Sequence, residues 1–417
     1  MSYWDVSPKR PASPGDWEES IRLACRWVTD VSLIRTPQPE FLAGAQYAHV
    51  NRYADWRGAF RGEYNAATGR WDVFCPIWHG GQGVKALALA GSLLGDGQYL
   101  EAAKFAADFI LRNQITDPAD EDRGLILAYE DANINITAIL ESLDGLFALA
   151  EVSGEARYAD ATVAALRWVA RKAFRPAEGL FHAEYMRDRR AFRPPYFEAH
   201  RGRMKIGCPS LDDGVFVTGY HLTGEAALLE VAARTADRLV ADEGPPGNWL
   251  EYPPANPLTG LLHPRNGYWW GRPMWMVHRA TGEQRYLHCC RRTARWYVEA
   301  MRLDGGMFRD TGVEFRTPSF GHATSGIACA ASLWCDLIGE YGDTEWHEPL
   351  RRALGFCHGV QLAETRDANL RGAVLEKVMP PDRSDAAPWY LRDVGTFFYI
   401  QAACKALSRI PDVLCPS

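Results

Sequence analysis

The sequence predicts an all-α fold, an (α/α)6 toroid of about twelve helices, and three observations carry that prediction. Apolar residues recur with helical periodicity along most of the 417 residues. A glycine followed by an acidic residue, with an aromatic residue or leucine three positions after the acid, occurs five times at intervals of 58 to 70 residues. Each of these pairs lies between two helical patterns, so one repeat has the size of one helical hairpin. Five such hairpins, and a sixth formed by the first and last helices, would close a ring.

The repeated turn explains how each hairpin is made. Glycine ends the first helix because it adopts the left-handed backbone conformation without steric cost, and the acid favours the start of the second helix. The five pairs are Gly95-Asp96, Gly154-Glu155, Gly224-Glu225, Gly282-Glu283 and Gly342-Asp343. The expected helices span residues 17–33, 82–94, 97–114, 133–152, 155–173, 212–223, 225–242, 267–281, 283–303, 322–341, 344–363 and 392–408.

The inner helices of the ring should be the shorter, more apolar ones, such as those within 86–94 and 323–337. The irregular stretch 35–81 contains FRGEYNAATGRWDVF, which predicts a short β-hairpin. We expect residues 1–417 to form a single toroid domain, with residues 1–16 as an extended N-terminal arm. An open α-solenoid is the alternative, but the loops between the hairpins are less uniform than solenoid repeats.

Composition and charge narrow the function classes. Hydrophobic content of 47% and charged content of 24% are typical of a globular protein, and a net charge of −6 provides no basic field for nucleic acid. The sequence shows neither the apolar core of a signal peptide nor a run of membrane-spanning length. The ten cysteines include no CxxC and several lie in apolar helical patterns, which fits a reducing, cytoplasmic location. We therefore expect a small-molecule or oligosaccharide substrate, with no membrane or nucleic-acid partner.

Chemically active side chains gather in the loops that lead into the expected inner helices. Acids, histidines, aromatics and arginines that converge from separate hairpins are the expected contents of a carbohydrate pocket. The third loop places two adjacent carboxylates, Asp212 and Asp213, at the start of an apolar helix, where an ordinary helix cap is the competing interpretation. The loops read FCPIWHGGQG, LAYEDANINIT, CPSLDDG, HPRNGYWWGRP and RTPSFGHATSG.

Three of these loops resemble motifs of the unsaturated glucuronyl and rhamnogalacturonyl hydrolases, glycoside hydrolase families 88 and 105. SLDDGVF is similar to the family motif around a catalytic Asp, PRNGYWWG resembles an Arg-Gly-Asn-Gly-Trp segment, and HATSGIACA resembles a later helix start. Together they extend from about residue 80 to about 360. The chain departs from the family at Ser210, where the family has Trp, and it lacks one glycine after Arg265. The family's second acid is matched only by Glu130 and Asp131.

The resemblance implies protonation of the C4=C5 bond of an unsaturated uronic acid, followed by addition of water at C5. Asp212 aligns with the catalytic Asp of the family and is the expected general acid and base, with Asp213 as the local alternative. Asp131 is the expected second carboxylate, and Glu130 is nearly as good a candidate. A donor carboxyl must be neutral, and burial and a neighbouring like charge can keep it so.

Substrate-binding roles follow from residue type. Arg265 and Arg272 are candidates for the uronate carboxylate, because a guanidinium can bind it with two hydrogen bonds. The remaining candidates are Trp78, His79, Tyr129, Asn133, Asn266, Tyr268, Trp269, Trp270 and His322. No phosphate-binding loop occurs, and the histidines of these loops are too far apart in sequence to indicate a metal site, so no cofactor is expected.

Three other functions are also compatible with the sequence. A saturated exo-glucuronidase would use the same two carboxylates in ordinary glycoside hydrolysis. A sugar isomerase similar to the N-acylglucosamine 2-epimerases would exchange a proton between two histidines, for which His79 and His322 are the candidates. A toroid that binds carbohydrate without turnover is the competing class.

Overall fold

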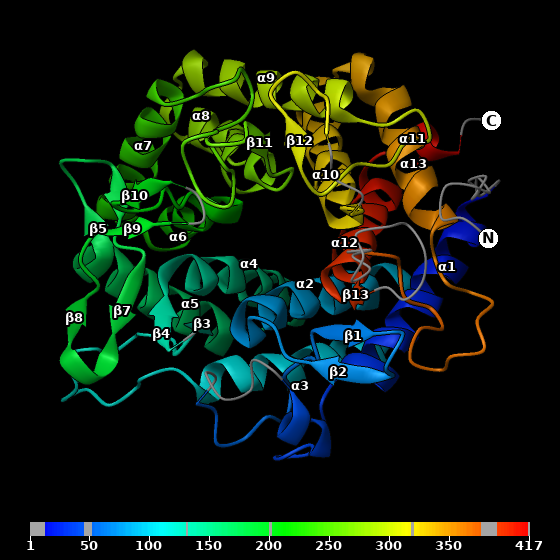
Figure 1. Ribbon diagram of the computed structural model, residues 1–417, viewed down its shortest axis with the longest axis horizontal. Helices are drawn as coiled ribbons and strands as arrows, with labels where there is room; N and C mark the ends of the chain where they lie inside the picture. Colours follow the sequence, from blue (N-terminus) through cyan, green and yellow to red (C-terminus); the bar gives the residue numbers. More distant parts are fainter. Residues whose placement is uncertain are drawn as a thin grey trace.

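The expected (α/α)6 toroid is confirmed in the computed structural model, whose helices run around a ring (Figure 1). The structure describes residues 13–45, 52–130, 132–199, 202–317, 321–376 and 390–415. The inner helices are α2 (Pro76–Leu94), α4 (Ile136–Ser153), α6 (Val215–Thr223), α8 (Met274–Thr281), α10 (Thr324–Tyr341) and α12 (Val394–Arg409). The outer helices are α1 (Pro14–Trp27), α3 (Gly97–Arg112), α5 (Ala156–Trp168), α7 (Ala226–Ala241), α9 (Gln284–Ala300) and α11 (His347–Gly359).

Contacts between neighbouring elements close the ring. α12 packs against α2, α2 against α4, and α10 against α12, while α1 covers α12 from outside. Two short helical segments, η6 (Asp212–Gly214) and η7 (Gly267–Gly271), lead into α6 and α8. η7 contacts both η6 and α10 and so completes the inner wall. No helix in these described ranges is long and apolar enough to cross a membrane.

The five repeated glycines end the inner helices as expected. Their φ angles lie between 61° and 81°, in the left-handed region. A Cβ added at any of them would meet no other atom within 4 Å, so the backbone conformation, and not lack of space, requires glycine. The five are Gly95, Gly154, Gly224, Gly282 and Gly342.

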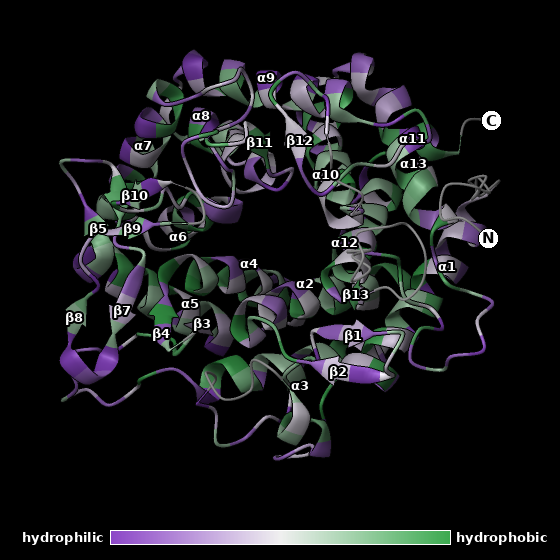
Figure 2. Ribbon diagram, in the orientation of Figure 1, coloured by the Kyte–Doolittle hydropathy of each residue, from purple (hydrophilic) through white to green (hydrophobic). Residues whose placement is uncertain are grey.

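Helix α2 begins at Pro76, earlier than the predicted residue 82, because its glycine-rich start is helical. Proline suits the first helical position, where its missing N–H is not needed. A Cβ at Gly145 of α4 would overlap the carbonyl oxygen of Gly81, so the two helices cross in close contact. Tertiary packing therefore overrides the low helix propensity of glycine here. Figure 2 shows hydrophobic residues along α4 and hydrophilic ones along the outer helices α7 and α9.

Short strands line one face of the ring. The predicted hairpin is confirmed as β1 (Glu63–Asn65) paired with β2 (Arg70–Asp72). β13 (Tyr390–Arg392) pairs with the other edge of β1, which ties the last inner helix to the segment before the first. A four-stranded sheet contains β3 (Tyr129–Glu130), β4 (Asn133–Asn135), β7 (Glu184–Met186) and β8 (Ala191–Phe192). The two-stranded pairs are β5 (Phe174–Arg175) with β6 (Leu180–Phe181), β9 (Tyr196–Glu198) with β10 (Arg203–Lys205), and β11 (Leu261–Leu262) with β12 (Thr311–Gly312).

The expected N-terminal arm, residues 1–16, lies largely outside the described residues. Helix α1 begins at Pro14, and the Ser13 hydroxyl accepts a hydrogen bond from the Asp16 N–H. The Asp16 carboxylate accepts from the Ser13 N–H in return, so a capping box fixes the start of the first helix.

Candidate functional site

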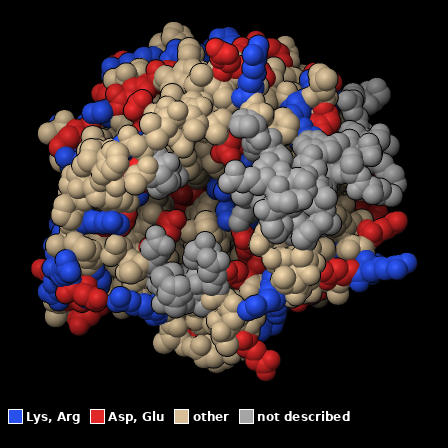
Figure 3. All heavy atoms as spheres, viewed as in Figure 1, with Lys and Arg blue, Asp and Glu red and all other residues tan. Residues whose placement is uncertain are grey.

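A cavity of about 320 Å³ lies at the end of the ring where the inner helices begin. Segments that lead into, or begin, all six inner helices contribute to its wall. Figure 3 shows a hollow near the centre of the ring with acidic and basic side chains inside it. The polar and aromatic lining residues are Trp78, Glu130, Asn135, Glu141, Lys205, Asp212, His263, Arg265, Trp269, Trp270, Arg309 and Arg392.

Asp212 is the buried acid at the start of η6. It is 1% exposed and lines the cavity, and its Oδ2 has no hydrogen-bond partner within the described ranges. Burial raises its pKa well above the usual range, and the nearby charges of Glu141 and Asp213 raise it further. The side chain is therefore suited to hold a proton and to donate it into the cavity.

Glu141 is the second buried carboxyl of the cavity, and it lies in the second turn of α4. Its Oε2 accepts a hydrogen bond of 2.8 Å from the indole Nε1 of Trp269. Burial raises its pKa well above the usual range, and the opposing effect of the Arg265 charge is smaller. The charge of Glu141 raises the pKa of Asp212, and the charges of Asp213 and Glu130 raise that of Glu141, so both buried carboxyls hold a proton more tightly than an exposed carboxyl does.

Cationic side chains form another part of the wall. The Arg265 guanidinium lies between two indoles, with its Cζ 4.6 Å from the ring centre of Trp78 and 5.1 Å from that of Trp269. Its Nε and one Nη are buried without a hydrogen-bond partner in the described part of the chain. Arg392 pairs with Glu63 at 2.8 Å. Burial, together with the charges of Arg392 and Arg265, lowers the pKa of Arg309 to about 10. Three arginines therefore face one small cavity, a strong attraction for an anion.

Six of the residues predicted from sequence meet in this cavity: Glu130, Asp212, Trp78, Arg265, Trp269 and Trp270. The Glu130 carboxylate accepts a hydrogen bond from Asn135, across the β3–β4 turn. The rings of His263 and Trp269 stack with centres 5.6 Å apart and planes 10° apart. Asp131, the expected second acid, lies outside the described residues.

The other predicted residues lie outside the cavity wall. Tyr129 and Asn133 border a separate cavity of about 190 Å³. Asn266 donates to Asn248 and to a backbone carbonyl, which occupies its amide inside the fold. Asp213, Tyr268 and Arg272 belong to a buried ion-pair network below the cavity.

Both histidines of the two-histidine alternative also point elsewhere. The Nδ1 of His79 lies 2.5 Å from the Asp393 carboxylate, and burial lowers its pKa. The Nδ1 of His322 lies 2.9 Å from an Arg302 nitrogen, and burial together with that charge lowers its pKa to about 4. Among the described residues, His263 is the histidine that lines the cavity.

Sequence reasoning did not select Glu141, Lys205, Arg309 or Arg392. Glu141 has only a partial signal: it is a carboxylate between Leu140 and Leu143 of an apolar stretch, but the same helix also carries Asp144 and Glu151. Arg392 ends β13 two positions before α12 begins at Val394, so it occupies a position equivalent to that of the loops before the other inner helices. Lys205 ends the short strand β10 and Arg309 lies on an irregular segment, and neither carries a comparable signal.

Comparisons with known proteins show the fold. No protein-family model matches the chain, and no curated protein matches it. The solved structures that resemble it include an unsaturated glucuronyl hydrolase from Bacillus sp. GL1, responsible for the degradation of glycosaminoglycan, at a TM-score of 0.63 and 15% identity, covering 95% of this chain and 97% of that one.

Enzymes with other activities are equally similar. A cellobiose 2-epimerase from Bacillus thermoamylovorans has a TM-score of 0.66 and 10% identity, covering 95% of this chain and 100% of that one. A D-mannose isomerase has a TM-score of 0.64 and 11% identity, covering 96% and 100%. The chain thus has the toroid fold that glycoside hydrolases and sugar epimerases share.

Proposed function

We propose that this protein is a glycoside hydrolase that acts on oligosaccharides ending in a 4,5-unsaturated uronic acid. The observation that carries the proposal is the Asp212 carboxyl, which is buried with an unpartnered oxygen and a raised pKa in the wall of an arginine-rich cavity. A neutral carboxyl can protonate a double bond, and the arginines suit a negatively charged sugar.

The reaction follows from these groups. Protonated Asp212 gives its proton to C4 of the C4=C5 bond, and water adds to C5 while its own proton passes to a carboxylate, Glu141 or Asp212 itself. The resulting C5 hemiketal opens to a ketone, and the hemiacetal left at C1 expels the remaining sugar as an alcohol. One water is consumed, and the proton given to C4 is restored to the pair of acids.

Arginine and tryptophan side chains of the cavity wall are suited to bind the substrate. Arg265 and Arg309 are suited to hold the uronate carboxylate, because Arg265 has buried donors without partners and Arg309 is held in the same arginine cluster. Trp78, Trp269 and Trp270 offer flat apolar faces to the sugar rings.

The sugar 2-epimerase alternative is disfavoured by the positions of its two histidines. His79 and His322 are both buried against other side chains, so neither faces the cavity. A saturated glucuronidase is still compatible with the Asp212 and Glu141 pair. Aryl glucuronides and N-acetylglucosamine therefore accompany the unsaturated substrates in the test.

The test follows the ultraviolet absorbance of the conjugated double bond in unsaturated uronyl disaccharides. Wild type should remove the absorbance, and Asp212→Asn should lower kcat by about 10²–10⁴-fold because the proton donor is lost. Asp122→Asn is the matched control, since Asp122 is equally buried but is bound by Tyr185 and Trp168 away from the cavity. Absorbance that wild type leaves unchanged, or an Asp212→Asn enzyme as fast as wild type, would refute the proposal.

A further inference from the structure

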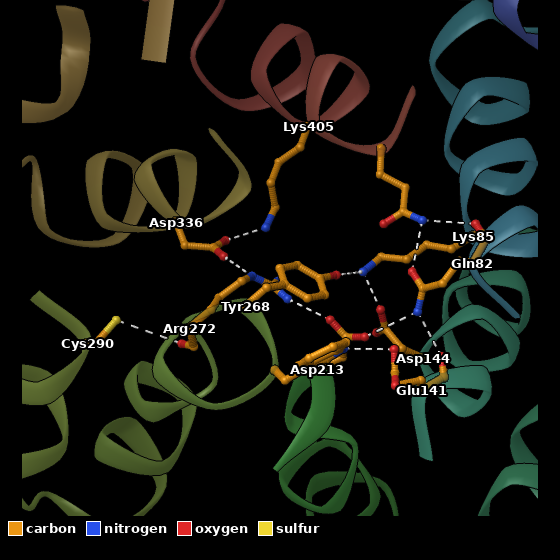
Figure 4. A network of polar contacts seen from close by, with 12 residues as sticks. Gln82, Lys85, Glu141, Asp144, Asp213, Tyr268, Arg272, Cys290, Asp336 and Lys405 are labelled. Carbon is orange, nitrogen blue, oxygen red and sulfur yellow. Dashed lines mark hydrogen bonds and ion pairs between the residues drawn. The ribbon is translucent and has the colours of Figure 1, made fainter. Parts of the chain in front are cut away.

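A buried ion-pair network lies beneath the cavity and joins the inner helices (Figure 4). Its centre is Arg272, which donates to the Asp213 carboxylate at 3.0 Å and to the Asp336 carboxylate at 2.8 Å. Asp336 on α10 also accepts from Lys405 at 2.6 Å and from Arg409 at 3.1 Å, both on α12. Against the opposing effect of burial, the charges of Lys405 and Arg272 lower the pKa of Asp336 to about 2, so Asp336 is a fixed anion that anchors Arg272.

The network reaches the proposed proton donor through the backbone of Asp213. Asp213 has φ 50° and ψ 9°, a left-handed conformation that non-glycine residues seldom adopt, and Gly214 follows with φ 71°. Such a conformation persists only where surrounding contacts hold it. The ion pair with Arg272 is such a contact, and it directs Asp213 into the network while Asp212 lines the cavity.

Gln82 of α2 connects the same network to the second acid. Its Nε2 donates to the backbone carbonyl of Glu141 at 2.8 Å and lies 3.4 Å from the Asp213 carboxylate. The side chain of Gln401 on α12 donates in turn to Gln82 at 3.0 Å. One amide therefore bridges α4, which carries Glu141, and the residue adjacent to Asp212.

We propose that the Asp213–Arg272–Asp336 chain of ion pairs positions the Asp212 carboxyl for proton donation. The inference rests on the proposed function and assigns Arg272 and Asp213 as positioning residues that do not touch the substrate. Of the acids Asp212, Asp213 and Glu141, only Asp213 forms an ion pair in the described part of the chain. Burial and the charge of Asp144 raise the pKa of Asp213, the charges of Lys85 and Arg272 oppose this, and the negative charge of ionised Asp213 raises the pKa of Asp212.

Other charged groups also face Asp212 and act on its titration. Glu141 on α4 adds negative charge, and the thiol of Cys208 lies close enough to interact electrostatically. The remaining titratable or charged groups of the same cavity are Cys75, Glu130, Lys205, His263, Arg265, Arg309 and Arg392. The Asp213 charge also raises the pKa of Glu141, so the infrared band of Asp212 has to be distinguished from that of Glu141 by comparison with Asp212→Asn.

The experiment measures the titration of Asp212 directly and the pH profile of the enzyme. The infrared band of the protonated Asp212 carboxyl is assigned by its absence in Asp212→Asn and followed from acid to alkaline pH. Asp213→Asn should move this titration, and the alkaline limb of kcat, to lower pH because a neighbouring negative charge is gone. It should also lower kcat at the optimum by about 10²-fold through loss of position, with KM close to that of wild type.

The variant Arg272→Lys separates the effect of the network on the position of Asp212 from the effect of its charge. Lysine keeps the positive charge but lacks the planar fork that binds two carboxylates at once. We expect kcat to fall while the infrared titration stays near that of wild type. Asparagine tolerates the left-handed conformation better than most residues, so Asp213→Asn should fold, and Arg272→Lys provides a second test if it does not. Asp122→Asn, the buried control, should leave kcat, the infrared titration of Asp212 and the pH dependence of kcat unchanged.

The outcomes separate this inference from the proposed function. If Asp213→Asn and Arg272→Lys leave kcat and the titration of Asp212 as in wild type, the positioning role is overturned. If wild type does not act on unsaturated substrates but Asp213→Asn still moves the infrared titration, the proposed function is wrong and the coupling of Asp213 to Asp212 stands.

Discussion

Replacement of Glu141 by glutamine should stabilise the protein at alkaline pH while it damages the site. Burial raises the pKa of Glu141, so the folded state holds its proton more tightly than the unfolded state does. The folded protein consequently loses stability as pH rises above the ordinary glutamate pKa, and the loss is complete once the folded-state pKa is passed. Glutamine has no proton to lose, and its side-chain carbonyl can still accept the 2.8 Å hydrogen bond from Trp269.

The size of the effect follows from linkage. Each unit by which the folded pKa exceeds the unfolded one corresponds to about 1.4 kcal/mol of unfolding free energy. An unfolding entropy of about 2.1 cal/mol/K per residue, over 417 residues, gives about 0.9 kcal/mol/K. Each unit of pKa elevation that lies below pH 8 should therefore appear as a gain in Tm of about 1.6 °C at pH 8 for Glu141→Gln.

Calorimetry at pH 5 and pH 8 measures the effect, with Glu151→Gln as the control. Glu151 lies on the same helix but is exposed, so its replacement should change Tm equally at both pH values. The Tm difference between Glu141→Gln and wild type should be larger at pH 8 than at pH 5. A difference that is constant, or smaller at pH 8, would refute the assignment of Glu141 as a carboxyl with a raised pKa.

Two further predictions concern the anion subsite and the helix crossing. Arg309→Met should raise KM for an unsaturated uronyl disaccharide about 10- to 100-fold, because hydrogen bonds to a charged group contribute about 1.5–3 kcal/mol. Steady-state kinetics measures this change. The control is Arg316→Met, which replaces an exposed arginine and should leave KM unchanged. Gly145→Ala should lower the unfolding free energy by about 1–3 kcal/mol because its Cβ would overlap the Gly81 carbonyl. Gly339→Ala, whose Cβ meets nothing within 4 Å, should be neutral or stabilising in the same denaturant titration, and equal losses for both glycines would contradict the packing argument.

Much of the fold could be predicted because it depends on local chemistry. A glycine at the end of a helix specifies its left-handed conformation within a few residues, and this is why Gly154 and Gly282 mark hairpins so clearly. The start of α2 could not be predicted in this way. Its glycines favour a loop by propensity, and only the close contact of Gly81 with α4 explains their helical conformation.

Site residues could be predicted where they lie in the loops before the inner helices. They could not be predicted where the position of a side chain depends on an ion pair between different helical hairpins. Asp212 and Asp213 are neighbours with the same chemistry, yet one lines the cavity and the other pairs with Arg272, 59 residues away. The sequence contains no sign of that choice, because it depends on how η6 and η7 meet. Glu141 was overlooked for the opposite reason: helical periodicity draws attention to the apolar residues around it.

The pairing of β1 with β13 determines how late the ring can close during synthesis of the chain. Glu63 and Arg392 are 329 positions apart, and their ion pair forms part of the join that closes the ring. A ribosome adding about 5–20 residues per second needs about 15 to 65 s to extend the chain from one to the other. During that time the nascent chain exposes the apolar flanks of α2 that α12 will later cover. These flanks of α2 therefore stay uncovered until the last inner helix has been translated.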